Sequence, residues 1–135
     1  MAIKLSEAVR NARLDAIETA VGLSAILKIR TGVAPTNCAA ADSGTVLVTA
    51  NLPSDWMAAA ATGSKALSGS WQDAAADAAG VAGHFRLYAS NGTTCHLQGT
   101  VTITGSGRDM ELDNTNIAVG QTVTITSFTL TDGNA

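Results

Sequence analysis

The sequence predicts a mainly β protein, an antiparallel β-sandwich or jelly roll preceded by one N-terminal α-helix. Apolar residues recur with a helical period only before Gly22. From Leu23 onward, apolar and polar residues alternate in short runs, which turn residues separate at intervals of about 8–12 residues. We therefore expect an N-terminal helix, 1–22, that acts as an interaction arm, and a β-sandwich domain, 23–135.

A helix is predicted over residues 4–21. Its apolar stripe comprises Leu5, Val9, Ala12, Leu14, Ala16, Ile17 and Val21. Ser6 suits the N-cap, and Gly22 suits the C-terminal end. A single helix of this length is marginally stable, so the stripe is expected to be buried on the β body of the same chain or on another subunit. The expected partner interface comprises Leu5, Val9, Arg10, Ala12, Arg13, Ala16 and Ile17.

The next segments predict two strands joined by a loop of small residues over 32–44. The strand predicted over 23–31 points four apolar residues inward: Leu23, Ala25, Leu27 and Ile29. The strand predicted over 45–52 does the same with Val46, Val48, Ala50 and Leu52.

The stretch 56–80 has the weakest pattern. Alternating residues predict a strand over 65–71, whereas 72–80 contains no large apolar residue and is expected to be a loop or an irregular edge strand. Trp56 and Trp71 are expected to anchor either the core or an interface.

Residues 81–103 alternate around an Asn-Gly turn and predict a β-hairpin. A two-residue loop would bury a histidine beside Leu87. A bulge, or a loop with an odd number of residues, instead places Leu87 opposite Leu97 and Ala89 opposite Cys95. We predict the loop with an odd number of residues, because a slip of one residue moves every side chain to the other face.

Two further strands are predicted near the C-terminus. Met110 and Leu112 point inward in a strand over 109–113, and a bulge near Ser127 restores the alternation of a strand over 121–131. The first of these strands is expected to form a solvated acidic edge, with a Ca²⁺ site as the alternative, because it carries Asp109, Glu111 and Asp113.

Composition excludes several partner classes. Charged residues make up 14% of the 135 residues, aromatic residues 4%, and the net charge is −3. Residues 1–30 carry five cations and three anions, and the rest of the chain carries three cations and eight anions. We therefore expect no nucleic-acid partner, since the β body lacks a basic patch. No apolar run reaches the length of a membrane span, so no membrane partner is expected either.

The first residues contain too many charges for a secretory signal, so the chain is expected to be made in the cytoplasm. Cys38 and Cys95 are then expected to be reduced and packed, and a disulfide between them is the alternative if the protein later leaves the cell.

No residues converge on a site for chemistry, so we expect no enzyme activity, no catalytic residue, no cofactor and no metal. Cys95 and His96 are neighbours in a strand and point to opposite faces, which prevents a nucleophile–base pair. His84 and His96 lie about 13 Å apart along the hairpin at ~3.3 Å per residue, too far apart for one metal ion.

Four segments carry a resemblance to a known class of proteins: SEAVRNARLDAIETAVG, LKIRTGVAPTNCAAADSGTVL, LPSDWMAAA and GHFRLYASNGTTCHLQGTV. The chain resembles small structural proteins of tailed bacteriophages. The resemblance implies a non-enzymatic virion component, made in the cytoplasm of the bacterial host. Within that class we expect a capsid decoration (cement) protein that binds the major capsid protein or other virion proteins. Such proteins are often homo-oligomers, dimers or trimers, and the resemblance transfers no catalytic residue.

Two other functions are weighed against this expectation. One is a tail or head–tail connector protein, which would be a different structural component of the virion. The other is a carbohydrate-binding β-sandwich module, in which exposed aromatic side chains stack on sugars. Its stacking residues would be Trp56, Trp71 and Tyr88.

Overall fold

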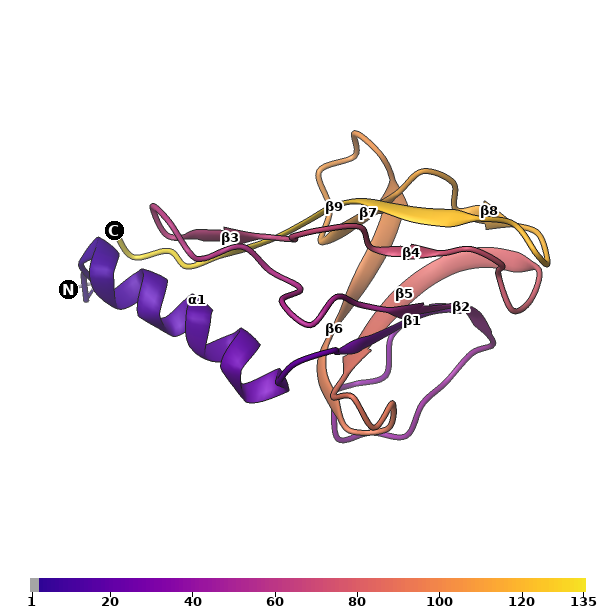
Figure 1. The fold of residues 1–135 in the computed structure, drawn as a ribbon, viewed down its shortest axis with the longest axis horizontal. Helices are drawn as coiled ribbons and strands as arrows, with labels where there is room; N and C mark the ends of the chain where they lie inside the picture. Colours follow the sequence, from indigo (N-terminus) through magenta and orange to yellow (C-terminus); the bar gives the residue numbers. More distant parts are fainter. Residues whose placement is uncertain (1–2) are drawn as a thin grey trace.

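The computed structural model describes residues 3–135, which form one helix and nine strands (Figure 1). The elements are α1 Glu7–Val21, β1 Ile26–Thr31, β2 Val46–Asn51, β3 Ser64–Ala66, β4 Gln72–Asp73, β5 Gly80–Tyr88, β6 Cys95–Ile103, β7 Met110–Leu112, β8 Asn116–Ile117 and β9 Val123–Thr131. The mainly β class and the N-terminal helix are confirmed. Residues 1–2 of the predicted interaction arm lie outside the described residues.

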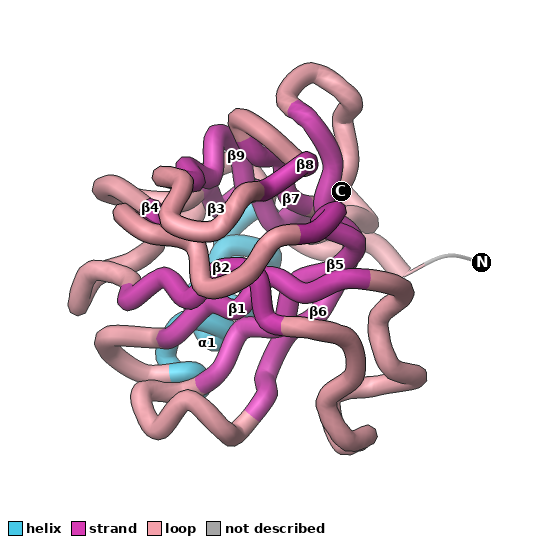
Figure 2. The backbone as a smooth tube through the Cα atoms, turned by 90° about the vertical axis from the view of Figure 1, so that its right-hand side faces the viewer, coloured by secondary structure: helices cyan, strands magenta, loops and turns pink. Residues whose placement is uncertain are grey.

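The strands form one curled mixed sheet that resembles half a barrel (Figure 2). The strand order is β2-β1-β5-β6-β7-β9-β3, while β4 pairs with β9 and β8 pairs with β5. The prediction of a wholly antiparallel sheet is wrong at one pair: β6 and β7 are parallel, with Val101 opposite Met110. The short connection between them reverses direction at Gly105 and Gly107, whose positive φ angles of 95° and 71° suit glycine.

The core lies inside the curl and is organised around aromatic side chains. Trp56 and Trp71 are 0% and 1% exposed, which settles their place as core residues. Their ring centroids are 5.9 Å apart, and Phe128 continues the cluster 5.4 Å from Trp71. The Trp56 indole N–H donates to the Gly22 carbonyl at 2.9 Å, so the core also holds the end of α1 in place.

The β1–β2 pair follows the predicted pattern except at Leu23 and at the start of β2. Leu47 is fully buried in place of the predicted Val46, because the register shifts where Arg30 lies opposite Val46. Ala25, Leu27 and Ile29 are fully buried, but the prediction that Leu23 points inward is wrong, because Leu23 is 72% exposed. Ser24 has a positive φ of 53°, and β1 begins only at Ile26, so the alternation does not extend back to Leu23.

The hairpin formed by β5 and β6 has the predicted pairing of Leu87 with Leu97. The predicted pairing of Ala89 with Cys95 is wrong, because Cys95 lies opposite Tyr88 and the register shifts beside them. The extra residue is His96, which is exposed. The predicted loop with an odd number of residues is therefore wrong: six residues, 89–94, separate Tyr88 from Cys95, and a bulge within the strand restores the register.

The strand β7 is not an acidic edge, because it lies between β6 and β9. Glu111 is 9% exposed, and its carboxylate accepts the Gly107 N–H at 2.7 Å. Asp109 likewise accepts the Thr100 N–H at 3.1 Å. Both carboxylates thus accept hydrogen bonds from backbone N–H groups of neighbouring segments. Residues 3–135 contain no group of three His, Cys, Asp or Glu side chains placed to hold a metal ion.

The last strand contains the predicted bulge. Glu111 lies opposite Ser127 and Leu112 opposite Ile125, so Thr126 is the extra residue of β9.

Among the described residues, none of the helical segments is long and apolar enough to cross a membrane.

Candidate interaction surface on the N-terminal helix

The side of α1 that faces the β body is polar. Four of its side chains accept backbone N–H groups from the segment 57–63, which runs beside the helix (Figure 1). The pairs are Glu18 with Met57 at 3.3 Å, Asp15 with Ala60 at 3.0 Å, Glu7 with Thr62 at 3.2 Å, and Asn11 with Gly63 at 2.9 Å. The helix thus satisfies donors that a neighbouring strand would otherwise take.

A buried lysine completes this contact. Lys65 of β3 has a side chain that is only 2% exposed, and its ammonium lies 2.7 Å from an Asp15 oxygen and 2.8 Å from a Glu18 oxygen. Burial alone would lower the pKa of Lys65, but the hydrogen bonds to Asp15 and Glu18 outweigh it and raise that pKa. The hydrogen bond from Lys65, followed by that from the Ala60 N–H, lowers the pKa of Asp15. Both partners therefore stay charged at neutral pH.

Apolar contact between α1 and the body is limited. Leu14 and Val21 are 3% and 5% exposed, and Ile17 is half-buried. The side of the helix that points away from the body consists of small apolar residues exposed to solvent, and we call it the outward face: Val9, Ala12, Ala16 and Ala20. The larger apolar residues of α1 thus face the body, as is usual for a surface helix, and only Val9 and three alanines remain on the outward face.

The seven residues predicted as a partner interface divide into two groups. Val9, Ala12 and Ala16 lie together on the outward face, and Arg13 lies beside it with its Nε 3.2 Å from Asp132. The other three, Leu5, Arg10 and Ile17, are half-buried against their own chain.

The C-terminal segment accounts for part of that burial. The Leu5 N–H donates to the Asn134 carbonyl at 2.7 Å, and the Arg10 guanidinium donates to the Asp132 carbonyl at 3.3 Å. The two ends of the described chain therefore meet at α1.

Sequence reasoning missed the polar side of α1. Its signal is the spacing of Glu7, Asn11, Asp15 and Glu18, which recur at intervals of four, four and three residues and so share one side of a helix. Charged side chains on a helix are normally solvated, so this stripe does not by itself indicate contact with another segment.

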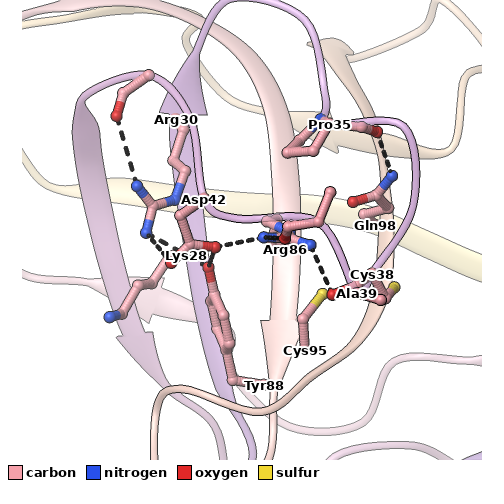
Figure 3. A network of polar contacts seen from close by, with 12 residues as sticks. Lys28, Arg30, Pro35, Cys38, Ala39, Asp42, Arg86, Tyr88, Cys95 and Gln98 are labelled. Carbon is pink, nitrogen blue, oxygen red and sulfur yellow. Dashed lines mark hydrogen bonds and ion pairs between the residues drawn. The ribbon is translucent and has the colours of Figure 1, made fainter.

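A second polar network fastens the loop between β1 and β2 over the hairpin (Figure 3). The Arg86 guanidinium, 1% exposed, donates to the carbonyls of Asn37, Cys38 and Ala40 at 3.1, 2.9 and 3.1 Å and to the Asp42 carboxylate. Arg30 and Tyr88 also donate to the Asp42 carboxylate, at 3.0 and 2.7 Å.

The charge state of this network follows from its geometry. Burial would raise the pKa of Asp42, but the hydrogen bonds from Tyr88 and Arg86 and the charges of Arg30 and Arg86 lower it. An ionised Asp42 between two guanidinium groups makes the loop a fixed part of the fold.

The residues considered for chemistry lie in different environments. His84 is fully buried, with its Nδ1 2.9 Å from the Gly32 carbonyl, whereas His96 is exposed at the bulge. Cys38 and Cys95 are free, half-buried thiols beside Arg86 (Figure 3).

No protein-family model, no curated protein and no solved structure matches this chain. Function is therefore inferred from the residues and geometry of the chain itself.

Proposed function

We propose that the chain is a structural protein of a tailed-bacteriophage virion, made in the host bacterial cytoplasm and incorporated into the virion. Within that class we propose a capsid decoration (cement) protein that binds and stabilises the shell of the major capsid protein. The resemblance of four segments to small phage structural proteins supports the class. The outward face of α1 supports a binding role.

The outward face is the observation that carries the proposal. Small side chains such as Ala12 and Ala16 let a partner backbone approach a helix closely, and burying their apolar surface is favourable. The polar side of the same helix is already occupied by the segment 57–63. A partner that binds the outward face would therefore contact an apolar helix surface, which the β body of this chain holds in a fixed position.

Binding of this kind stabilises a shell through repetition. Each contact on a helix face is small, but many identical copies on one shell act together, and so do the linked subunits of a dimer or trimer. We propose such a homo-oligomer, with no nucleic-acid or membrane partner.

The finer fold assignment, a β-sandwich or jelly roll, belongs to the same proposal and is supported by the way the curled sheet closes over one core containing Leu27, Trp71 and Phe128.

The test uses purified chain and capsid shells that lack it. Ala12→Glu and Ala16→Glu place a charge on the outward face while keeping good helix formers, and each is expected to reduce the amount of protein that cosediments with shells at least tenfold. Ala118→Glu, at an exposed position in the connection after β8, is the matched control and is expected to bind normally. Full binding by both helix variants would overturn the role of the outward face.

The number of copies per virion separates decoration from a connector. A decoration protein is present in many copies across the shell, and a connector is present in few, so quantitative mass spectrometry of purified virions distinguishes them.

The carbohydrate-binding alternative loses its stacking residues, because Trp56, Trp71 and Tyr88 are all buried, at 0%, 1% and 0% exposure.

A further inference from the structure

Two cysteines that are far apart in the sequence meet at the edge of one guanidinium group (Figure 3). Cys95 lies at the start of β6, opposite Tyr88 of β5. Cys38 lies in the loop between β1 and β2, where its carbonyl accepts a hydrogen bond from Arg86 at 2.9 Å. Figure 3 shows both side chains beside Arg86, and the Cys38 thiol is close enough to that of Cys95 to raise its pKa. Both cysteines are free and half-buried.

We propose that Cys38 and Cys95 form a reversible intramolecular disulfide, which fastens the loop between β1 and β2 to strand β6 when the chain meets a low-molecular-weight disulfide oxidant. The inference is independent of the proposed function, because it needs only the two thiols and an oxidising environment.

The reaction is thiol–disulfide exchange in two steps. One cysteine, as its thiolate, attacks a sulfur of the small disulfide, forms a mixed disulfide and displaces the first small thiolate. The second cysteine thiolate attacks the cysteine sulfur of the mixed disulfide, forms the protein disulfide and displaces the second small thiolate. The protein loses two electrons and two protons, and the oxidant leaves as two thiols.

The surroundings favour pairing over independent reactions of the two thiols. Arg86 of β5 is almost fully buried and donates to the carbonyls of Asn37, Cys38 and Ala40. Cys38 therefore cannot move away from the β5–β6 hairpin without breaking these bonds. Burial and the neighbouring Cys38 thiol raise the pKa of Cys95 to about 11, although Arg86 acts in the opposite direction. The Cys95 thiol therefore stays protonated at neutral pH, and its exchange is faster in mildly alkaline buffer.

The test compares the full-length chain after incubation with oxidised glutathione and after incubation with a reducing agent. Peptide mapping under non-reducing conditions is expected to find Cys38 linked to Cys95, and the oxidised chain is expected to melt ~5–15 °C higher than the reduced chain. Cys38→Ser and Cys95→Ser are each expected to abolish both the link and the response of the melting temperature to the oxidant.

A parallel incubation in denaturant shows that the oxidant is active. If the unfolded chain oxidises while the folded chain keeps two alkylatable thiols, the geometry forbids the bond and the proposal is overturned. Dimers linked through either cysteine at low protein concentration, in place of the internal link, would overturn it as well.

Discussion

At the scale of single residues, buried charges organise the segments that have no regular structure. Arg86 donates hydrogen bonds to backbone carbonyls of the loop between β1 and β2. Lys65 donates to the Ala58 carbonyl at 2.9 Å and also binds two carboxylates of α1. Each cation is almost fully buried and is stable there only because anions and carbonyls surround it. The position of each loop thus depends on one side chain from the sheet.

Replacing Asp42 with Asn tests this dependence. The amide keeps the shape of the side chain but leaves Arg86 and Arg30 without their shared anion, so the free energy of unfolding is expected to fall by about 1–3 kcal/mol at neutral pH. Urea denaturation measures the change. Asp55→Asn, at an exposed carboxylate, is the control and is expected to have little effect.

The same variant also gives the sign of the acid response. The pKa values of Asp15 and Asp42 lie below 3.8 in the folded chain, so their stabilisation is complete above pH 3.8 and is lost as the pH falls through the lower folded values. Between about pH 5 and about pH 2, the free energy of unfolding is expected to fall less steeply for Asp42→Asn than for the unchanged chain. Equal slopes would contradict the pKa shift of Asp42.

At the scale of elements, α1 supplies hydrogen-bond acceptors to a backbone segment, as a neighbouring strand does in a sheet. Its polar side chains accept four backbone N–H groups from the segment 57–63, and β3 follows immediately, paired with β9. The approach is close: a Cβ atom on Gly63 would lie 2.0 Å from the Arg10 guanidinium. The helix is therefore positioned by directional hydrogen bonds more than by an apolar stripe.

Replacing Asn11 with Ala tests this contact. The change improves intrinsic helix propensity but leaves the buried Gly63 N–H without its acceptor, so a net loss of about 1–2 kcal/mol in the free energy of unfolding is expected. Thr19→Ala, at an exposed position of the same helix, is the matched control and is expected to be neutral or stabilising. Equal effects of the two changes would mean that the polar side of α1 contributes nothing.

At the scale of the whole molecule, the helix closes the fold. The ends of the described chain meet beside α1, where the Leu5 N–H donates to the Asn134 carbonyl (Figure 1). Leu14 and Val21 are buried, and the indole of Trp56, in the centre of the core, bonds to the carbonyl of Gly22. The proposed interaction arm is therefore also part of its own β body.

Removing residues 1–21 is expected to destabilise the β body. The deletion leaves the N–H groups of Met57, Ala60, Thr62 and Gly63 without their acceptors and uncovers apolar surface, a loss of about 4 kcal/mol or more at roughly 1 kcal/mol per hydrogen bond. The truncated chain is expected to melt at a lower temperature in calorimetry than the full chain. An unchanged melting temperature would show that the helix is an independent arm. Point changes on the outward face are thus a sharper test of binding than the deletion.

Local patterns were enough to predict the helix with its Ser6 and Gly22 ends, most strand positions, the pairing of Leu87 with Leu97 and the bulge in β9, because side-chain period, capping and turn residues act over short distances. They were not enough for the parallel pairing of β6 with β7, the central place of Glu111 or the polar contact side of α1. Each of these depends on which distant backbone groups come to lie nearby, and no short-range pattern records that. The outward face follows for the same reason: Val9, Ala12 and Ala16 remain exposed because hydrogen bonds to the segment 57–63 set the rotation of the helix.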